Sequence, residues 1–342
     1  MKYGHGPLPA GKLPAGLLRD LLSNLPDCAD VILGPGIGRD VAVLDPGAGL
    51  LVAKSDPITF ATDEIGWYAV HVNANDLASA GATPRWFLVT LLLPAGETDP
   101  ALVIRIMDDL REAADGLGVA LVGGHTEITV GIDRPIVCGT MLGSVSADDL
   151  VRPDGIRPGD EILLTNGMAV ETTAIVAREM PEVLRDAGFS DADIERAVEY
   201  LRDPGISVTE HSRIARSAGD IHAMHDATEG GLATALPELS EASGVTLRVR
   251  RDVLESAISP LARRVCEAVD IDPLGTISSG CLIIVVSPET VDDVADALGE
   301  AGIDVFRVGN AVDGPTCCEY VDGTPWPVFD RDEIARLFEG NA

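Results

Sequence analysis

Two kinds of hydrophobic pattern alternate along the sequence, and this alternation restricts the fold more than any other feature. Apolar runs at 86–93 and 136–145 are typical of buried strands, whereas 65–80 and 100–118 carry apolar residues at helical spacing. Asp99 and the glycines at 116 and 118 are suitable end signals for the second helix. Strands interleaved with helices favour a mixed α/β or α+β fold.

A turn-rich connection at 151–159, with the sequence VRPDGIRPG, divides the chain into two halves of similar style. Its 342 residues are enough for two hydrophobic cores. We therefore expect one domain at 1–150 and a second at 151–335. In the second half we expect strands at 161–165, 246–249 and 281–286, and helices at 170–180, 191–202, 208–218, 232–243 and 291–301.

Charge and hydropathy exclude several classes of protein. The net charge of −30 argues against a nucleic-acid partner, because such binders present basic surfaces to phosphates. No apolar run approaches the roughly 20 residues that span a bilayer. The beginning of the sequence, MKYGHGPLPA, lacks the apolar core of a secretion signal. We expect a cytoplasmic protein without a membrane partner.

The six cysteines show neither a CxxC motif nor metal-ligand spacing with histidine. In a reducing cytoplasm they predict no structural disulfide. The adjacent pair Cys317-Cys318 is open to two interpretations, a redox-active pair or two structural residues.

Acidic residues and glycines recur beside the predicted strands. Asp56 follows the strand predicted at 50–53, Gly123-Gly124-His125 follows the strand at 119–122, and the glycine-rich turn at 34–38 precedes Asp40. Asp76 lies in an Ala-rich helix, where a carboxylate has to be paired or bound. Mg²⁺ takes one or two carboxylates together with phosphate oxygens, so the pattern predicts a magnesium–phosphate site. His125 could be a ligand, a base or a hydrogen-bonded structural residue.

Common nucleotide and hydrolase motifs are missing, which narrows the choice. The sequence has neither a Walker A motif nor a strand-anchored GxGxxG, and no Ser/His/Asp hydrolase signature. The common nucleotide-binding folds are therefore disfavoured.

The same segments resemble, in order, the motifs of the aminoimidazole ribonucleotide synthetase and HypE superfamily, whose fold is called PurM-like. GRDVAV at 38–43 is similar to GDDAAV, KSD at 54–56 to TTD, NDLASAGATP at 75–84 to NDLxxxGAxP, GGHTE at 123–127 to GGDT or GGET, and DATEGGLA at 226–233 to the D-x-T-R-G-G-L-A segment of HypE. The resemblance covers about residues 30 to 315.

This resemblance implies a two-domain PurM-like fold. Its N-terminal sheet would dimerise into a β-barrel, giving a homodimer with ATP near the interface, and its C-terminal domain would be α/β. ATP and Mg²⁺ are the implied cofactors. By position, the implied metal ligands are Asp40, Asp56, Asp76 and Asp226, the implied catalytic residues are Asp76, His125 and Asp226, and the implied nucleotide or phosphate contacts are Gly38, Asp40, Asp56, Asn75, Gly123, Gly124, Thr126, Gly230 and Gly231.

The sequence also departs from the family pattern. Arg39 replaces the first acid of GDDAAV, His125 stands where thiamine monophosphate kinase has Asp, and Glu229 replaces a HypE arginine. HypE carries its carbamoyl substrate on a C-terminal cysteine, whereas this sequence ends in FEGNA. We therefore expect a HypE-related chain that does not modify itself at such a cysteine.

Three functions follow from the resemblance. The first is an ATP-dependent enzyme that phosphorylates a carbonyl or amide oxygen, as a dehydratase or synthetase, on a small-molecule or protein-borne substrate. The second is a small-molecule kinase similar to thiamine monophosphate kinase, and the third is a non-catalytic nucleotide-binding assembly protein. Four aspartates at the motif positions argue against the third, because nucleotide binding alone would not need them all.

Overall fold

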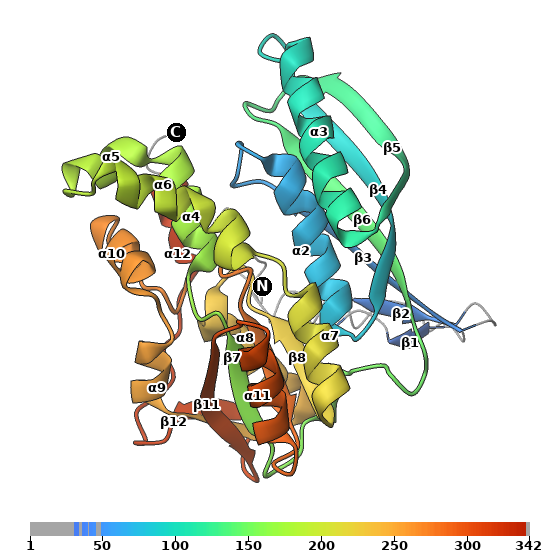
Figure 1. Ribbon diagram of the computed structural model, residues 1–342, viewed down its shortest axis with the longest axis vertical. Helices are drawn as coiled ribbons and strands as arrows, with labels where there is room; N and C mark the ends of the chain where they lie inside the picture. Colours follow the sequence, from blue (N-terminus) through green and yellow to red (C-terminus); the bar gives the residue numbers. More distant parts are fainter. Residues whose placement is uncertain (1–30, 34–35, 40, 46–48, 340–342) are drawn as a thin grey trace, which may run out of the picture.

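The computed structural model describes residues 31–33, 36–39, 41–45 and 49–339. Its N-terminal part is a six-stranded sheet with the strand order β1-β2-β3-β6-β4-β5 (Figure 1). The strands are β1 (Val31–Leu33), β2 (Ala42–Leu44), β3 (Leu50–Ile58), β4 (Thr83–Pro94), β5 (Ala120–Thr129) and β6 (Ile136–Val145). All neighbours are antiparallel except β4 and β5, which run parallel.

One face of this sheet is covered by α2 (Ile65–Ser79) and α3 (Pro100–Leu117) (Figure 1). Small alanines allow α2 to lie close to the sheet, and nearly all of its residues are buried. The Asp99 carboxylate caps α3 by accepting from the Leu102 N–H at 2.8 Å, and Gly118 ends the helix at a φ of 67°. Alternate residues of β4 and β6 point to the other face and stay partly exposed.

The C-terminal part contains a second six-stranded sheet with the order β12-β9-β11-β7-β10-β8. Its strands are β7 (Glu161–Thr165), β8 (Ile221–Asp226), β9 (Thr246–Val249), β10 (Leu282–Val286), β11 (Val305–Val312) and β12 (Cys317–Tyr320). The helices are α4 (Val170–Glu179), α5 (Pro181–Asp186), α6 (Asp191–Glu199), α7 (Thr209–Ala218), α8 (Gly231–Ser243), α9 (Arg251–Ser256), α10 (Pro260–Ala268), α11 (Val291–Glu300) and α12 (Glu333–Glu339), with a π-helical turn at Leu201–Gly205.

The two parts are joined by a buried polar contact as well as by apolar packing. Asn75 of α2 donates from Nδ2 to the Ile206 carbonyl oxygen at 2.7 Å and accepts from the Val208 N–H at 2.8 Å. The Ser212 hydroxyl donates to the Ala78 carbonyl oxygen at 2.7 Å. One hydrophobic cluster includes core residues of both sheets. The junction is therefore a continuous interior.

Most expected elements are present, and two corrections concern the site. β3 does not end near residue 53 but continues to Ile58, so Asp56 lies inside a strand. The segment 123–127 does not follow a strand but forms part of β5. In both cases polar residues or glycines interrupt the apolar run, while ladder pairing to β6 or β4 continues the strand. Within the described residues, no helix combines the length and apolar character that crossing a bilayer requires.

Candidate active site

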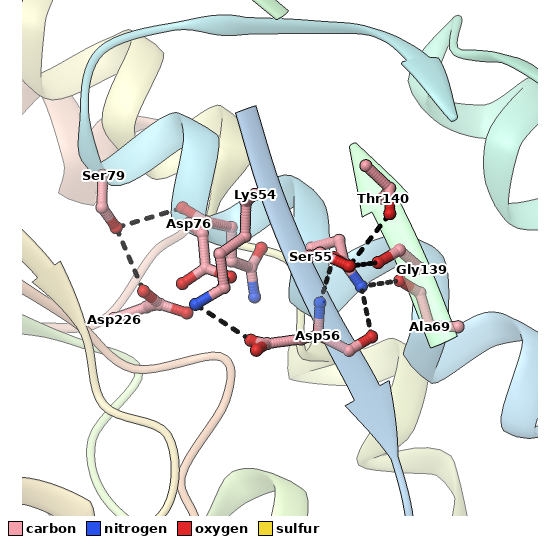
Figure 2. Close-up of polar contacts among 11 residues, drawn as sticks. Lys54, Ser55, Asp56, Ala69, Asp76, Ser79, Gly139, Thr140 and Asp226 are labelled. Carbon is pink, nitrogen blue, oxygen red and sulfur yellow. Dashed lines mark hydrogen bonds and ion pairs between the residues drawn. The ribbon is translucent and has the colours of Figure 1, made fainter. Parts of the chain in front are cut away.

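The site begins on β3, where side chains two residues apart share one face of the sheet. Lys54 and Asp56 both point to the face that α2 covers, and Asp76 of α2 approaches them (Figure 2). Lys54 Nζ lies 3.0 Å from Asp56 Oδ2 and 3.3 Å from Asp76 Oδ2. The side chains of Asp56 and Asp76 are 33% and 3% exposed. One ammonium thus joins a half-exposed carboxylate to a buried one.

A third carboxylate comes from the C-terminal domain. Asp226, at the end of β8, is fully buried. The Ser79 hydroxyl of α2 lies 3.3 Å from Asp226 Oδ1 and 3.0 Å from the Asn75 carbonyl oxygen (Figure 2). The structure therefore brings together Asp56, Asp76 and Asp226 from β3, α2 and β8.

Asn73 fixes the backbone beside Asp56. Its Oδ1 accepts from the Asp56 N–H at 3.0 Å, and its Nδ2 donates to the carbonyl oxygens of Ala69 at 2.9 Å and Asp56 at 3.4 Å. Asn73 and Lys54 were both missed as site residues by the sequence analysis. The signals were present, since Asn73 precedes Asp76 by one helical turn and Lys54 precedes Asp56 by the strand repeat.

The carboxylates provide hard oxygen donors, which suit Mg²⁺. Asp56 and Asp76 already share a cation, the Lys54 ammonium, so this pair can hold positive charge between its oxygens. In the described part of the chain, no group of three or more His, Cys, Asp or Glu side chains is arranged to hold a metal ion. The site therefore fits a cation that is held by two carboxylates and whose coordination shell is completed by phosphate oxygens. Asp40 lies outside the described residues, and its role as a ligand stays a prediction.

Asn75 uses both ends of its amide on the backbone of the C-terminal domain. The family resemblance implies that Asn75 is a nucleotide or phosphate contact. In the structure it instead fixes the position of α2, the helix that carries Asp76, against the second domain. Any nucleotide contact by Asn75 stays a prediction.

The glycine pair at the start of α8 has structural reasons of its own. A Cβ on Gly231 would lie 2.5 Å from the Thr276 carbonyl oxygen and 2.6 Å from that of Leu274. The Gly230 N–H, expected near a phosphate or substrate, donates to Asp332 Oδ2 at 2.5 Å. A carboxylate of the C-terminal segment thus accepts the hydrogen bond of the Gly230 N–H, and the roles of Gly230 and Gly231 at a phosphate or substrate stay predictions.

Gly38 is buried against the same helix, where a Cβ would lie 2.6 Å from the Glu238 carbonyl oxygen. Glu238 Oε2 lies 3.1 Å from Nε2 of the buried His225, the residue before Asp226. The segment that carries Gly38 therefore packs against α8, whose Glu238 side chain contacts the strand that carries Asp226.

The other predicted residues lie apart from the carboxylates within one chain. Gly123, Gly124, His125 and Thr126 are exposed on β5, at the edge of the first sheet and three strands from β3. His125 pairs with Thr90, whose neighbours Val89 and Leu91 point into the helix-covered core. His125 therefore faces away from Asp56, and its side chain is 68% exposed. Their catalytic and nucleotide-binding roles stay predictions.

A buried carboxyl that the sequence analysis did not single out lies in the first turn of α4. Glu171 is 3% exposed, and its Oε2 accepts from the Ser279 N–H at 3.0 Å. Burial raises the pKa of Glu171 to about 7, although the hydrogen bonds to Ser279 oppose this shift. Glu171 also raises the pKa of the buried Tyr68 of α2, after the larger effect of burial. Glu171 and Tyr68 thus place further ionisable groups at the domain junction.

The adjacent cysteines are remote from the carboxylates. Cys317 and Cys318 lie on β12, at the opposite edge of the second sheet from β8 and Asp226. Among the described residues, all five cysteines are free. Burial raises the pKa of the Cys318 thiol far above its usual value, which disfavours a reactive thiolate.

Two PurM-type domains that meet at a carboxylate site define the class of protein. The N-terminal model of the AIR synthase related proteins matches residues 38–145, and the C-terminal model matches residues 157–320. The chain belongs to the AIR synthase related protein family.

Among its relatives is a putative hydrogenase expression/formation protein of Methanocaldococcus jannaschii, 27% identical over 85% of this chain and 84% of the relative. The carbamoyl dehydratase HypE of Cupriavidus necator is 28% identical over 91% of this chain and 85% of that protein.

Solved structures agree with the family assignment. HypE in complex with ATP matches with a TM-score of 0.65 and 25% identity, over 89% of this chain and 87% of that structure. Thiamine monophosphate kinase from Aquifex aeolicus matches with a TM-score of 0.67 and 18% identity, over 91% of this chain and 96% of that structure. The kinase likeness shows the fold alone, whereas the HypE relatives share sequence over most of their length.

Proposed function

We propose that this protein is an ATP-dependent enzyme of the HypE type, which activates a carbonyl or amide oxygen by phosphorylation. The observation that carries the proposal is the convergence of Asp56 and Asp76 on the Lys54 ammonium, with Asp226 held beside the same helix by Ser79 at the domain junction. The support from relatives is that HypE proteins are named carbamoyl dehydratases and that one HypE structure contains ATP.

The chemistry of such a site is mainly positioning and electrostatics. When bound, Mg²⁺ would neutralise charge on the ATP phosphates. Asp56 and Asp76 would hold it, with Asp40 as the further ligand that the sequence predicts. Asn73 keeps Asp56 in place, and Ser79 keeps Asp226 beside α2.

The substrate, in this proposal, is a carbamoyl or amide group carried by a separate small molecule or protein. Its support is the position of the cysteines, since Cys317 and Cys318 lie across the second sheet from Asp226. Neither thiol is placed to present a substrate to the carboxylates of its own chain.

A homodimer is part of the same proposal. β5 is an edge strand, and large apolar side chains are exposed on β4 and β5, with Leu88 37%, Val122 53% and Ile128 59% exposed. Unpaired edge strands and exposed apolar patches are typical of interaction surfaces. A second copy against this surface would cover both and bury on the order of 2,000 Å². Light scattering at micromolar protein tests it, and a monomer would contradict it.

Product analysis tests the activity. Calorimetry should show ATP binding that depends on Mg²⁺, and turnover should release ADP with inorganic phosphate once a carbamoylated acceptor is supplied. A stable phosphorylated acceptor would instead establish a kinase. No binding of ATP or ADP at millimolar nucleotide would eliminate the enzyme.

The first prediction concerns Asp76→Asn, which keeps the shape of the side chain and removes its charge. We expect ATP turnover to fall at least about 100-fold, in line with the loss of one electrostatic contact to the transition state. The matched control is Asp108→Asn on the exposed side of α3, which should turn over ATP as the wild type does. Equal turnover in both variants would remove Asp76 from the catalytic machinery.

A further inference from the structure

Lys54 is unusual in this sequence before its contacts are considered. The chain has 25 basic residues, of which only Lys2, Lys12 and Lys54 are lysines. Lys54 is the single lysine among the residues that the structure describes, and its side chain is 19% exposed. Lysine presents a compact point charge, whereas the planar guanidinium of arginine spreads its charge over a fork. A compact charge is the one that resembles a metal ion.

The ammonium sits where two carboxylates converge. It contacts oxygens of both Asp56 and Asp76 at 3.0 and 3.3 Å, from an extended strand on one side and a buried helix on the other. Figure 2 shows the Lys54 ammonium between the Asp226 and Asp56 carboxylates in this view. Buried carboxylates need compensating charge, and the 3% exposed Asp76 receives it from Lys54. The chain thus carries its own counter-ion inside the site.

We propose that the Lys54 ammonium occupies a cation position of the Asp56–Asp76 pair, so that it and a divalent ion compete for the same carboxylate oxygens. This inference rests on the proposed magnesium–nucleotide site. It implies that free Mg²⁺ binds weakly, because it has to displace a positive charge of the chain. A metal that arrives with ATP meets less resistance, because the phosphates offer the displaced ammonium a new anionic partner. Lys54 therefore makes metal binding depend on the nucleotide.

The test uses Mn²⁺ alone as the probe, with binding followed by electron paramagnetic resonance or calorimetry on the full chain without nucleotide. Lys54→Met keeps most of the length of the side chain and removes the charge. We expect it to bind Mn²⁺ at least about tenfold more tightly than the wild type, because a cation a few ångströms away is gone. Lys54→Arg keeps a positive charge and should bind Mn²⁺ as weakly as the wild type.

Arg111→Met is the matched control for the change in net charge. Arg111 lies on α3 with its side chain 61% exposed, so its loss should leave Mn²⁺ affinity unchanged. A folded Lys54→Met protein that binds Mn²⁺ no more tightly than Arg111→Met would overturn the proposal.

A second measurement needs no variant. Acylation of lysine amines, mapped by mass spectrometry, should modify Lys54 several-fold faster in 10 mM Mg²⁺ than in its absence, because the metal displaces the ammonium from its carboxylates. An unchanged rate of acylation at Lys54 would contradict displacement even if Lys54→Met fails to fold.

The two proposals can be rejected independently of each other. If Lys54→Met binds Mn²⁺ more tightly but the protein never binds ATP, only the proposed enzymatic function is rejected. If the protein turns over ATP but Lys54→Met shows no gain in Mn²⁺ affinity, only the competition between Lys54 and the metal is rejected.

Discussion

Glu171 is the residue whose charge the fold opposes most clearly. Its carboxyl is buried, and its pKa is raised to about 7. Between pH 4.5 and pH 7 the folded protein keeps a proton on Glu171 that the unfolded chain has lost. The contribution of this group to the free energy of unfolding is therefore largest at low pH and falls as the pH rises through 7.

Glu171→Gln should remove that pH dependence, because glutamine imitates the protonated carboxyl and can still accept from the Ser279 N–H. At pH 5 we expect the variant and the wild type to be about equally stable. At pH 8 the variant should be more stable, by at most about 3 kcal/mol for a shift of this size. Urea unfolding at both values measures the difference, and a difference that does not change with pH would contradict this account.

Single residues also show where sequence reasoning reaches its limit. The prediction that Asp76 must be paired in its Ala-rich helix is confirmed by its contact with Lys54. The partner could not be predicted while the strand was expected to end near residue 53, because Lys54 then had no defined direction. Asp332 gave no signal either, since its contact with Gly230 spans 102 positions of the sequence.

At the scale of elements, the C-terminal segment 326–334 packs across the second domain. Trp326 Nε1 donates to the Ala233 carbonyl oxygen at 3.0 Å, and Phe329 packs over Gly275. Asp332 accepts from the Gly230 N–H and, at 2.8 Å, from the Ile334 N–H. This segment holds the start of α8 in place, beside the strand that carries Asp226.

Asp332→Ala should therefore weaken the packing of the 326–334 segment. It leaves two buried N–H donors without the carboxylate, and we expect a loss of about 2 to 5 kcal/mol in the free energy of unfolding. Asp330→Ala is the control, because Asp330 is exposed two residues earlier and its loss should change stability by less than about 0.5 kcal/mol. Urea denaturation compares the free energies of unfolding of the two variants, and equal losses would show that the packing of the 326–334 segment does not depend on Asp332.

Elements with a plain hydrophobic pattern were predicted well from the sequence. The strands β6, β7 and β9 have the expected bounds, and β10 differs by one residue. β8 and β11 were missed because His222, Asp226, Arg307 and Asn310 interrupt their apolar patterns. Their strand conformation comes from pairing with β10 and β7, which is a property of the assembled sheet.

For the molecule as a whole, two buried histidines make the free energy of unfolding fall in acid. His71 and His211 are 5% and 6% exposed, and burial lowers the pKa of each to about 4. The charge of Arg202 adds to the effect at His71, whereas Glu210 opposes it at His211. The unfolded chain takes up these protons near pH 6.5 and the folded protein does not. Their contribution to stability is therefore complete above pH 6.5 and falls as the pH drops toward 4.

We expect the free energy of unfolding to lose up to about 3 kcal/mol for each imidazole over that interval. Glu171 works in the opposite direction, so the total slope is smaller than the sum. His71→Gln should flatten the wild-type slope between pH 6.5 and 4.5, as measured by urea unfolding at half-unit steps. A slope that the substitution leaves unchanged would show that His71 is not the group that takes up the proton.

The continuous interior between the two domains also limits how the molecule can move. Opening the junction like a hinge would break both buried bonds of Asn75 and separate a shared hydrophobic core. Hinge closure around ligands relies on a few loop residues and little buried contact, which this junction does not offer. We therefore expect a nucleotide to bind with small rearrangements only, such as a change in the conformation of one side chain, while the two domains keep their relative orientation.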